Sequence, residues 1–297
     1  MYSDSCICFI VDLRSPKLQK ILETWIEEDL GHGDLTRFVL NNESASAHWL
    51  AKEDGIFCGG ELIKLIFQKI DPQVEIQLLI DDGQKFEKNQ RLLELHGPSS
   101  SLVAGERVTL NVAMHLSGIA TATALLVTKL SGSNVKLADT RKTTPGLRML
   151  EKYAFSCGGG INHRLGLDDA AMLKENHIQW SKGISESIKI LKQTIPWTKK
   201  IIVEAETPNQ AREAVEAGAD GVLLDEMSIH AIKKLVPELR QLAKNSKSIY
   251  VSQNIVIEVS GINPNNLSDY IFTGIDLIST SAPITKSKWM DLSMRFD

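Results

Sequence analysis

The second half of the chain alternates short apolar runs with segments that read as capped helices, and this repetition most restricts what it can fold into. The apolar runs cover residues 135–139, 201–206, 221–225, 255–260 and 275–280. Thr207-Pro208 starts one helical segment with a capping residue and a proline at the first helical position, and Asn263-Pro264 repeats the device before 267–274. Units of this kind form parallel sheets, which place reactive groups at the carboxyl ends of their strands.

The first half lacks this repetition and predicts a mixed region of helices and short strands. Apolar positions recur at helical spacing over 17–30 and stop at a glycine, so we expect an amphipathic helix there. Strand-like runs follow at 47–51 and 74–80. A long alanine-rich, proline-free stretch at 102–130 then predicts a connecting helix, with a candidate break at Ser117-Gly118.

Two domains follow from this change of pattern. We expect an N-terminal domain at residues 1–116 and a second domain at 117–284. The tail at 285–297 continues no repeat, and we expect it to pack back on the first domain.

The bulk properties exclude several kinds of partner. The net charge is −4 and the pI is about 6.0, whereas nucleic-acid and anionic-membrane binders usually present a basic face. No stretch approaches the roughly 18 apolar residues of a membrane span. The apolar run at 6–11 is too short for a signal peptide and lacks a basic lead-in, and the four cysteines show no metal-binding spacing. We therefore expect a cytoplasmic protein that binds neither nucleic acid nor membrane.

The segment from Asp139 to His177 is a basic island in this acidic chain. From 141 to 177 it holds six lysines and arginines against four aspartates and glutamates, a balance of +2. Arginine binds carboxylates and phosphates through paired hydrogen bonds, lysine adds a mobile charge, and the glycines at 158–160 let a ligand approach the backbone. The sequence thus predicts an anion site, although the same charges are equally expected of a solvated basic loop.

Glu204 and Asp225 stand at neighbouring predicted strand ends and are opposite in charge to this island. Two such carboxylates can hold Mg²⁺ through water or bind sugar hydroxyls, or each can simply cap the helix that follows it. A basic pocket beside carboxylates suits a phosphorylated sugar whose diphosphate carries magnesium. On this interpretation we expect Mg²⁺ as the cofactor.

Eight sequence strings, in order and spacing, resemble quinolinate phosphoribosyltransferases. In the second half they are ADTRKTTPGLR at 138–148, EKYA at 151–154, CGGGINHRLGL at 157–167, KENH at 174–177 and LLDEMS at 223–228. In the first half they are EDLGHGDLT at 28–36, GERVTLN at 105–111 and SGIATAT at 117–123. The similarity covers nearly the whole chain.

The resemblance implies both an activity and an architecture. The family makes nicotinate mononucleotide from quinolinate and phosphoribosyl diphosphate, releasing diphosphate and carbon dioxide, on the de novo route to NAD. Its fold is an N-terminal α/β sandwich followed by an incomplete, open α/β barrel, and two subunits share each active site. We therefore expect a homodimer, or a higher oligomer built from such dimers.

The resemblance also assigns roles to residues of this chain. The carboxylates of quinolinate and the phosphates would be bound by Arg141, His163, Arg164 and Lys174, with Lys142 beside them and Arg107 reaching in from the partner subunit. Glu204 and Asp225 would face the ribose and the magnesium diphosphate, and together with Lys142 they are the expected catalytic residues. The 5'-phosphate would lie at Ser260, Gly261, Ser279 and Thr280.

Three positions depart from the family pattern. A second glycine usually follows in the late phosphate loop, but here Gly261 is followed by Ile262. Thr280-Ser281 replaces a more usual Val-Gly, which puts a side chain where the backbone is often bare. Asp225-Glu226 stands where Asp-Asn is common, which adds a negative charge near the expected metal.

Three other functions are compatible with these residues. One is a molybdenum-associated paralogue of the same architecture, although the intact 142–148 string and His163-Arg164 favour the phosphoribosyltransferase. Another is a barrel aldolase that uses Lys142 or Lys174 as a Schiff-base amine. The third is a non-catalytic sensor that binds phosphoribosyl diphosphate without turnover.

Overall fold

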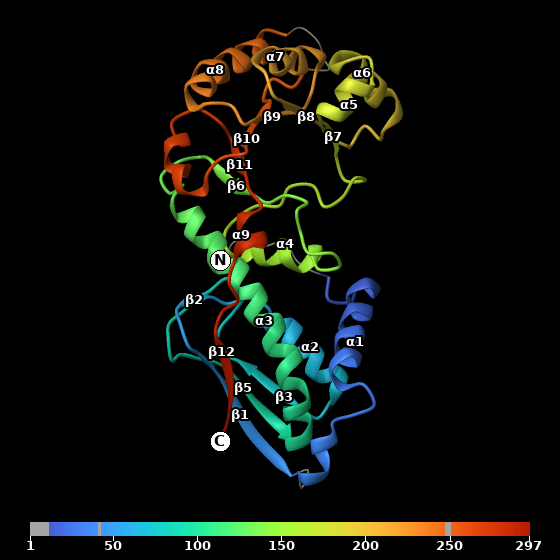
Figure 1. Ribbon diagram of the computed structural model, residues 1–297, viewed down its shortest axis with the longest axis vertical. Coiled ribbons are helices and arrows are strands. Elements are labelled where there is room, and N and C mark those ends of the chain that lie inside the picture. Colours follow the sequence, from blue (N-terminus) through green and yellow to red (C-terminus); the bar gives the residue numbers. More distant parts are fainter. Residues whose placement is uncertain (1–11, 41–42, 247–250) are drawn as a thin grey trace, which may run out of the picture. The chain divides into compact units, whose positions relative to one another are not determined.

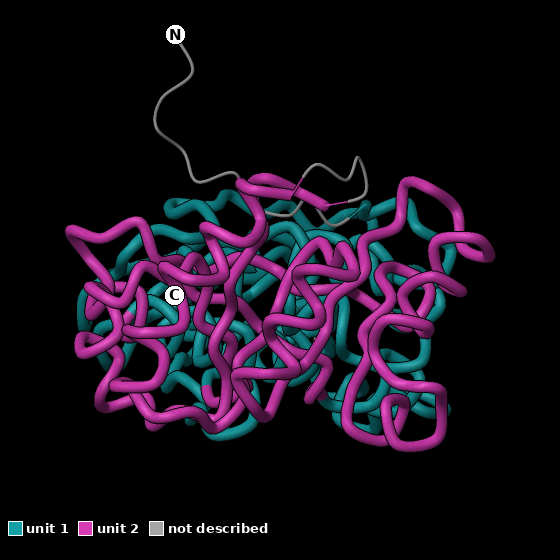
Figure 2. Tube along the Cα trace, turned by 90° about the horizontal axis from the view of Figure 1, so that it is seen from above, with its two compact units in different colours: residues 1–124, 144–159, 283–297 teal, residues 125–143, 160–282 magenta. Residues whose placement is uncertain are grey.

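The computed structural model describes residues 12–40, 43–246 and 251–297, so the apolar run at 6–11 lies outside the described residues. The chain divides into two units, coloured separately in Figure 2: unit 1 comprises 1–124, 144–159 and 283–297, and unit 2 comprises 125–143 and 160–282. The polypeptide therefore passes from one unit to the other four times. The sequence-based division has a single cut at 116/117, whereas these two units interleave along the chain.

Unit 1 contains a four-stranded antiparallel sheet built from distant parts of the sequence (Figure 1). Its strand order is β12 (Leu292–Phe296), β1 (Ser44–Ala51), β5 (Arg91–Pro98) and β3 (Glu75–Leu78). Ala47, Trp49 and Ala51 are buried and alternate with more exposed neighbours, because β1 has one face in the core. Met294 of β12 pairs with Trp49, so the last residues of the chain complete this sheet.

Helices supply the rest of unit 1. They are α1 (Pro16–Leu30), α2 (Gly60–Ile70), α3 (Ser99–Thr128), whose last residues belong to unit 2, and α4 (Arg148–Cys157). The turn η1 (Leu35–Val39) and the strand pair β2 (Gly55–Ile56) and β4 (Lys85–Phe86) complete the unit. Apolar residues of α2 and α3, including Phe67 and Leu110, pack with the sheet in one core. The helices predicted at 17–30 and 102–130 are confirmed, and α3 continues without a break through Ser117-Gly118.

The α3 helix corrects the expectation that no stretch of the chain is long and apolar enough to span a membrane. It has 30 residues and a window with a mean hydropathy of 1.5, so by length and composition alone it is apolar enough to cross a membrane. Half of that window is buried inside the protein. One such helix is weak evidence for a membrane span, because the central helix of a folded domain passes the same test.

Unit 2 contains a six-stranded sheet in which every neighbouring pair of strands is parallel (Figure 1). Its order is β6 (Lys136–Ala138), β11 (Leu277–Ser279), β10 (Val256–Ser260), β9 (Gly221–Asp225), β8 (Ile201–Ala205) and β7 (Ala171–Leu173). Since β6 and β7 stand at the two ends of this order, the sheet is open. The five predicted strands are all present, and β7 is an additional strand that the sequence reading did not include.

The helices of unit 2 follow its strands as the repetition predicts. They are α5 (Glu175–Trp180), α6 (Ile184–Thr194), α7 (Pro208–Ala217) and α8 (Ile229–Asn245), with the short element η2 (Pro264–Tyr270) near the end. The short helix α9 (Ala282–Lys286) begins with the last residue of unit 2 and otherwise belongs to unit 1. The predicted capping box of α7 is confirmed, because Thr207 accepts a hydrogen bond from the backbone of Gln210. Asn263-Pro264 instead begins a 3-10 turn, and the helix expected from about Pro145 begins at Arg148.

Gly105 allows α3 to pack closely against α2, because a Cβ atom at this position would overlap the ring of Phe67. We expect Gly105→Ala to lower the free energy of unfolding by about 1–2 kcal/mol, since overpacking outweighs the higher helix propensity of alanine. Urea unfolding followed by tryptophan fluorescence measures this. Gly221→Ala is the matched control, because the nearest atom to its Cβ would lie 3.5 Å away. A Gly105→Ala protein as stable as the wild type would contradict the close packing.

Candidate active site

The carboxyl ends of the unit 2 strands gather most of the residues singled out from the sequence. Lys174 follows β7, Glu204 lies near the end of β8, and Asp225, Ser260 and Ser279 are the last residues of β9, β10 and β11. Asp139 follows β6 directly. Because the strands are parallel, these residues share one edge of the sheet.

The buried carboxylate of Asp139 attaches the segment 161–164 to this edge. Asp139 is 0% exposed, and it accepts hydrogen bonds from the backbone N–H of His163 and from Nδ2 of Asn162, both at 2.8 Å. The backbone of Ile161 donates to Leu137 at 2.8 Å and accepts from Asp139 at 3.1 Å. The segment 161–164 is therefore joined to the sheet beside β6, and this fixes the position of the Arg164 backbone.

Arg141 and Arg164 bring two positive charges together. Burial lowers the pKa of Arg164, and the nearby charge of Arg141 lowers it further, while Asp169 and Glu204 act in the opposite direction. Arg164 also donates from Nη1 to the carbonyl of Ala170 at 2.9 Å, which orients its guanidinium. Two neighbouring guanidinium groups repel each other until an anion enters between them, so this part of the edge is suited to carboxylate or phosphate.

Glu204 and Asp225 form the acidic part of the same edge. Burial raises the pKa of Glu204, and the charges of Asp225 and Glu175 raise it further, whereas the ion pair with Lys174 partly offsets these effects. Asp225 accepts a hydrogen bond from the hydroxyl of Ser260. Asp225 thus lies close enough to disfavour the charge of Glu204, and a bound cation would relieve that repulsion.

The His163 ring uses both of its nitrogens within the protein. Nδ1 accepts the backbone N–H of Arg164 at 2.8 Å, and Nε2 lies 3.1 Å from Oε2 of Glu258 in β10. Glu258 is not among the site residues predicted from the sequence. A signal was present, because Glu258 is the one charged residue in the apolar run 255–260.

The remaining unit 2 residues occupy different environments. Lys142 is exposed, and its backbone donates to Thr140 Oγ1 at 3.0 Å. Gly261 has a φ of 71°, and a Cβ there would lie 2.8 Å from Cγ of Glu226, so the loops after β9 and β10 meet where only glycine fits easily. Ser279 is buried. Thr280 Oγ1 accepts the backbone N–H of Ala282 at 3.2 Å, so this hydroxyl caps the start of α9.

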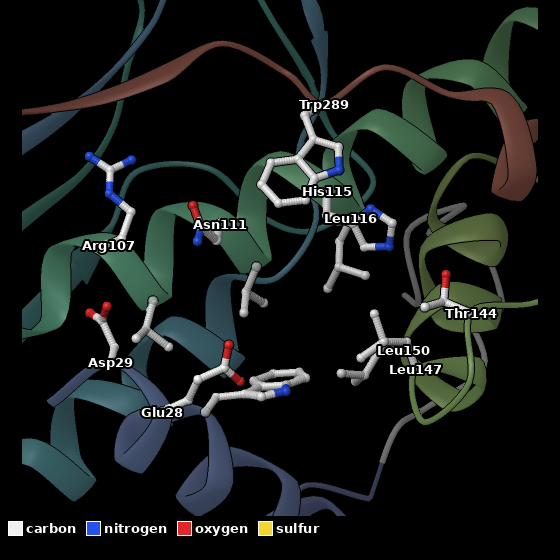
Figure 3. A pocket seen from close by; sticks show the side chains of 13 residues that line it. Glu28, Asp29, Arg107, Asn111, His115, Leu116, Thr144, Leu147, Leu150 and Trp289 are labelled. Atoms are coloured by element: carbon white, nitrogen blue, oxygen red, sulfur yellow. The ribbon is translucent and has the colours of Figure 1, made fainter. Parts of the chain in front are cut away.

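Arg107 lies in unit 1, exposed on α3, and it lines a cavity of about 520 Å³. Figure 3 shows Arg107, Asn111 and His115 on successive turns of α3, with Glu28 and Asp29 across the cavity at the end of α1. Trp25 and His115 also line this cavity.

Glu151 is a buried carboxylate beside this cavity and is held by hydrogen bonds from two residues of unit 1. Oε1 lies 3.0 Å from His115 Nε2, and Oε2 accepts the backbone N–H of Thr144 at 2.8 Å. Burial acts to raise the pKa of Glu151, but the hydrogen bonds from His115 and Thr144 outweigh it and leave the pKa below its ordinary value. Glu151 is therefore ionised at neutral pH and stabilises the folded state.

Groups that could hold a metal ion occur in both units. Among the described residues, Cys58, Asp82 and Cys157 of unit 1 place three potential ligand atoms within 4.8 Å of one another. Asp82 already accepts hydrogen bonds from the backbones of Gly59 and Gly60 and from the Tyr153 hydroxyl. Glu204 and Asp225 of unit 2 offer two hard oxygen ligands, a number that suits Mg²⁺ when a substrate supplies phosphate oxygens.

The open parallel sheet and its charged edge define an α/β enzyme for anionic substrates. Comparisons with known proteins agree. The sequence matches the family described as quinolinate phosphoribosyl transferase, through its N-terminal domain over residues 34–117 and its C-terminal domain over residues 119–295.

Relatives and solved structures cover almost the whole chain. A probable carboxylating nicotinate-nucleotide pyrophosphorylase of Synechocystis is 41% identical over 276 residues, which is 92% of this chain and 90% of the relative. The Bacillus subtilis protein of the same description is 41% identical and spans 94% of this chain and 93% of its own length. The crystal structure of NadC from Streptococcus pyogenes matches with a TM-score of 0.88 at 34% identity, covering 96% of this chain and 98% of that one. The chain belongs to the quinolinate phosphoribosyltransferase family, whose members are pentosyltransferases.

The lowered pKa of Glu151 predicts a pH-dependent stability. Because the folded state binds this proton less tightly than the unfolded state, the contribution is present above the ordinary value of 4.5 and is lost as the pH falls through the lowered pKa. We expect Glu151→Gln to lower the free energy of unfolding by about 1–3 kcal/mol at neutral pH, and the difference from wild type to shrink in acid.

Urea unfolding of both proteins at about pH 7 and about pH 4 measures this difference. Glu87→Gln replaces an exposed carboxylate of the same unit and serves as the control. A difference that stays constant between the two pH values would show that the ionised form of Glu151 is not the stabilising one.

Proposed function

We propose that this chain transfers the phosphoribosyl group of phosphoribosyl diphosphate to quinolinate, with decarboxylation, and so makes nicotinate mononucleotide for NAD synthesis. Its family and its named relatives support this reaction. The observation that carries the proposal is the pairing of two charge types on one edge of the unit 2 sheet. Arg141 and Arg164 are suited to a dicarboxylate, and Glu204 with Asp225 is suited to a ribose and a metal-bound diphosphate.

Quinolinate recognition requires cations placed for two adjacent carboxylates. Arg164 and Arg141 can each form paired hydrogen bonds with a carboxylate. Lys174 is ion-paired with Glu204, and it can turn to an incoming anion if Glu204 engages the ribose. Nicotinate has only one carboxylate and would leave part of this charge unpaired, so we propose that the edge selects quinolinate.

Ribosyl transfer needs stabilisation of positive charge at the anomeric carbon. The bond from that carbon to diphosphate breaks, its electron pair leaves with the diphosphate, and the ring nitrogen of quinolinate forms the new bond. Glu204 and Asp225 can stabilise the oxocarbenium-like centre, and no covalent nucleophile is required. The carboxylate next to the ring nitrogen then leaves as carbon dioxide. Its electron pair is stabilised by the pyridinium, and the ring carbon takes up a proton.

We propose Mg²⁺ as the ion that accompanies the diphosphate. The two carboxylates are hard oxygen ligands whose mutual repulsion a cation would relieve. Magnesium would neutralise the departing diphosphate, and Lys142, exposed at the same edge, would add positive charge near it. The 5'-phosphate would lie near Ser260, Gly261 and Ser279, with the backbone of Thr280.

We propose a homodimer in which Arg107 completes the active site of the partner subunit. Arg107 lies within the family string GERVTLN and is exposed on α3, so its charge is available to another chain. We also propose that the enzyme works in the cytoplasm without nucleic-acid or membrane partners, because its net charge is −4.

A product assay tests the reaction directly. With quinolinate, phosphoribosyl diphosphate and Mg²⁺, we expect nicotinate mononucleotide and carbon dioxide in equal amounts, whereas nicotinate in place of quinolinate gives no product. Chelation of Mg²⁺ should stop turnover, and added Mg²⁺ should restore it. Equal use of nicotinate, or binding of phosphoribosyl diphosphate without any turnover, would contradict the proposed function. Borohydride trapping of Lys142 or Lys174 with a carbonyl substrate would point to the aldolase instead.

Mixed dimers test the shared site. Arg107→Ala and Arg164→Ala should each be inactive, because each removes a cation from every site of its own homodimer. After subunit exchange at equal amounts, half of the dimers are mixed and each carries one intact site, so about one quarter of the wild-type activity should return. Two folded and exchanging variants that recover no activity would contradict the placement of Arg107 in the partner's site. Arg91→Ala, which removes an exposed arginine of unit 1, is the control and should keep full activity.

A further inference from the structure

Glu258 is a buried carboxylate to which the family resemblance gave no role. It is the third residue of β10 and is only 3% exposed, and its sequence neighbours Ile257 and Val259 are 0% exposed. Across the sheet it pairs with Leu223 of β9 and Leu277 of β11. A carboxylate in such surroundings costs folding free energy unless it is fully paired.

Glu258 is only partly paired within the described residues. Oε2 lies 3.1 Å from His163 Nε2, whereas Oε1 is buried and makes no hydrogen bond there. The sheet register puts Glu258 in line with Leu223 and Glu204 on the neighbouring strands. Residues in line share one face of the sheet, and so do residues two apart along a strand. Glu258 therefore shares a face with Glu204 and with Ser260. A buried carboxylate retained at this cost, on this face, is expected to serve the site rather than the stability of the sheet.

The contacts of His163 fix the position of its ring proton. Nδ1 accepts the backbone N–H of Arg164 at 2.8 Å, so this nitrogen carries no proton. The proton of a neutral ring must then be on Nε2, where it points to Glu258 Oε2. The two contacts together fix the tautomer and the plane of the ring, and they leave neither nitrogen for a substrate.

We propose that Glu258 is a positioning residue for the anion site. Its carboxylate holds the His163 ring, the ring holds the backbone of Arg164, and the guanidinium of Arg164 is thereby aimed beside Arg141. His163 then acts by supporting Arg164 rather than by binding quinolinate itself. This role presupposes the proposed phosphoribosyl transfer, but the ring geometry on which it depends can be measured without turnover.

Two substitutions separate positioning from a purely structural effect. Glu258→Gln keeps an oxygen that accepts the Nε2 proton, whereas Glu258→Leu removes the acceptor and the buried charge together. We expect Glu258→Leu to raise the KM for quinolinate on the order of tenfold with a smaller change in kcat, and Glu258→Gln to stay within about threefold of wild type. A purely structural role would lower the amount of active enzyme and leave KM unchanged. Glu206→Leu makes the same change at an exposed position just beyond β8 and should leave both constants unaltered.

Nitrogen-15 NMR of histidine-labelled protein provides the readout that does not need activity. We expect the His163 ring to show a hydrogen-bonded Nε2–H in the wild type and in Glu258→Gln, and the Nε2–H signal to move away from its hydrogen-bonded position in Glu258→Leu. Unchanged ring signals in Glu258→Leu, or equal effects of Gln and Leu on KM, would overturn the positioning role. If the wild type fails to turn over quinolinate while the Nε2–H signal of His163 depends on Glu258, the proposed reaction is wrong and the positioning of His163 stands.

Discussion

The buried carboxylate of Asp139 is the interaction on which the candidate site depends. It accepts hydrogen bonds from the backbone N–H of His163 and from the side chain of Asn162, and these bonds attach the segment 161–164 to the end of β6. Because Asp139 is 0% exposed, breaking either bond would cost the buried carboxylate a donor, and this favours the observed arrangement of the segment. Arg141 lies two residues after Asp139 and Arg164 directly follows His163, so these bonds bring the two parts of the chain that carry the arginines together.

Charge separation along one sheet edge is the second constraint, and it explains how the chain tolerates so many ionisable groups in one place. Burial and the nearby charge of Arg141 both lower the pKa of Arg164, and burial and the charge of Asp225 both raise the pKa of Glu204, so like charges lie close together in both places. Each group is stable beside its opposite, and the ion pair between Lys174 and Glu204 joins the two parts. The two carboxylates of quinolinate would pair with the cations, and the ribose and magnesium of the second substrate would pair with the carboxylates, so both parts of the edge would be neutralised together.

The sequence predicted the parts of the fold that local pattern determines. The five apolar runs of unit 2 became strands, and Thr207-Pro208 capped α7, because these signals depend on neighbours in the chain. The strand β7 was missed because three residues are too few to show the alternation of apolar and polar side chains that indicates a strand. Asn263-Pro264 begins a 3-10 turn instead of the expected helix, because the form of this turn depends on packing. Glu258 was missed for a tertiary reason: its partner His163 is 95 residues away.

The location of bound quinolinate decides whether the carboxyl edge of the unit 2 sheet is the active site. A crystal structure of the enzyme with quinolinate and a non-hydrolysable analogue of phosphoribosyl diphosphate would show it. We expect quinolinate at the carboxyl edge of the unit 2 sheet, with its carboxylates on Arg141 and Arg164, and the ribose on Glu204 and Asp225. Quinolinate bound away from this edge, with those four side chains in contact only with solvent or with each other, would contradict it.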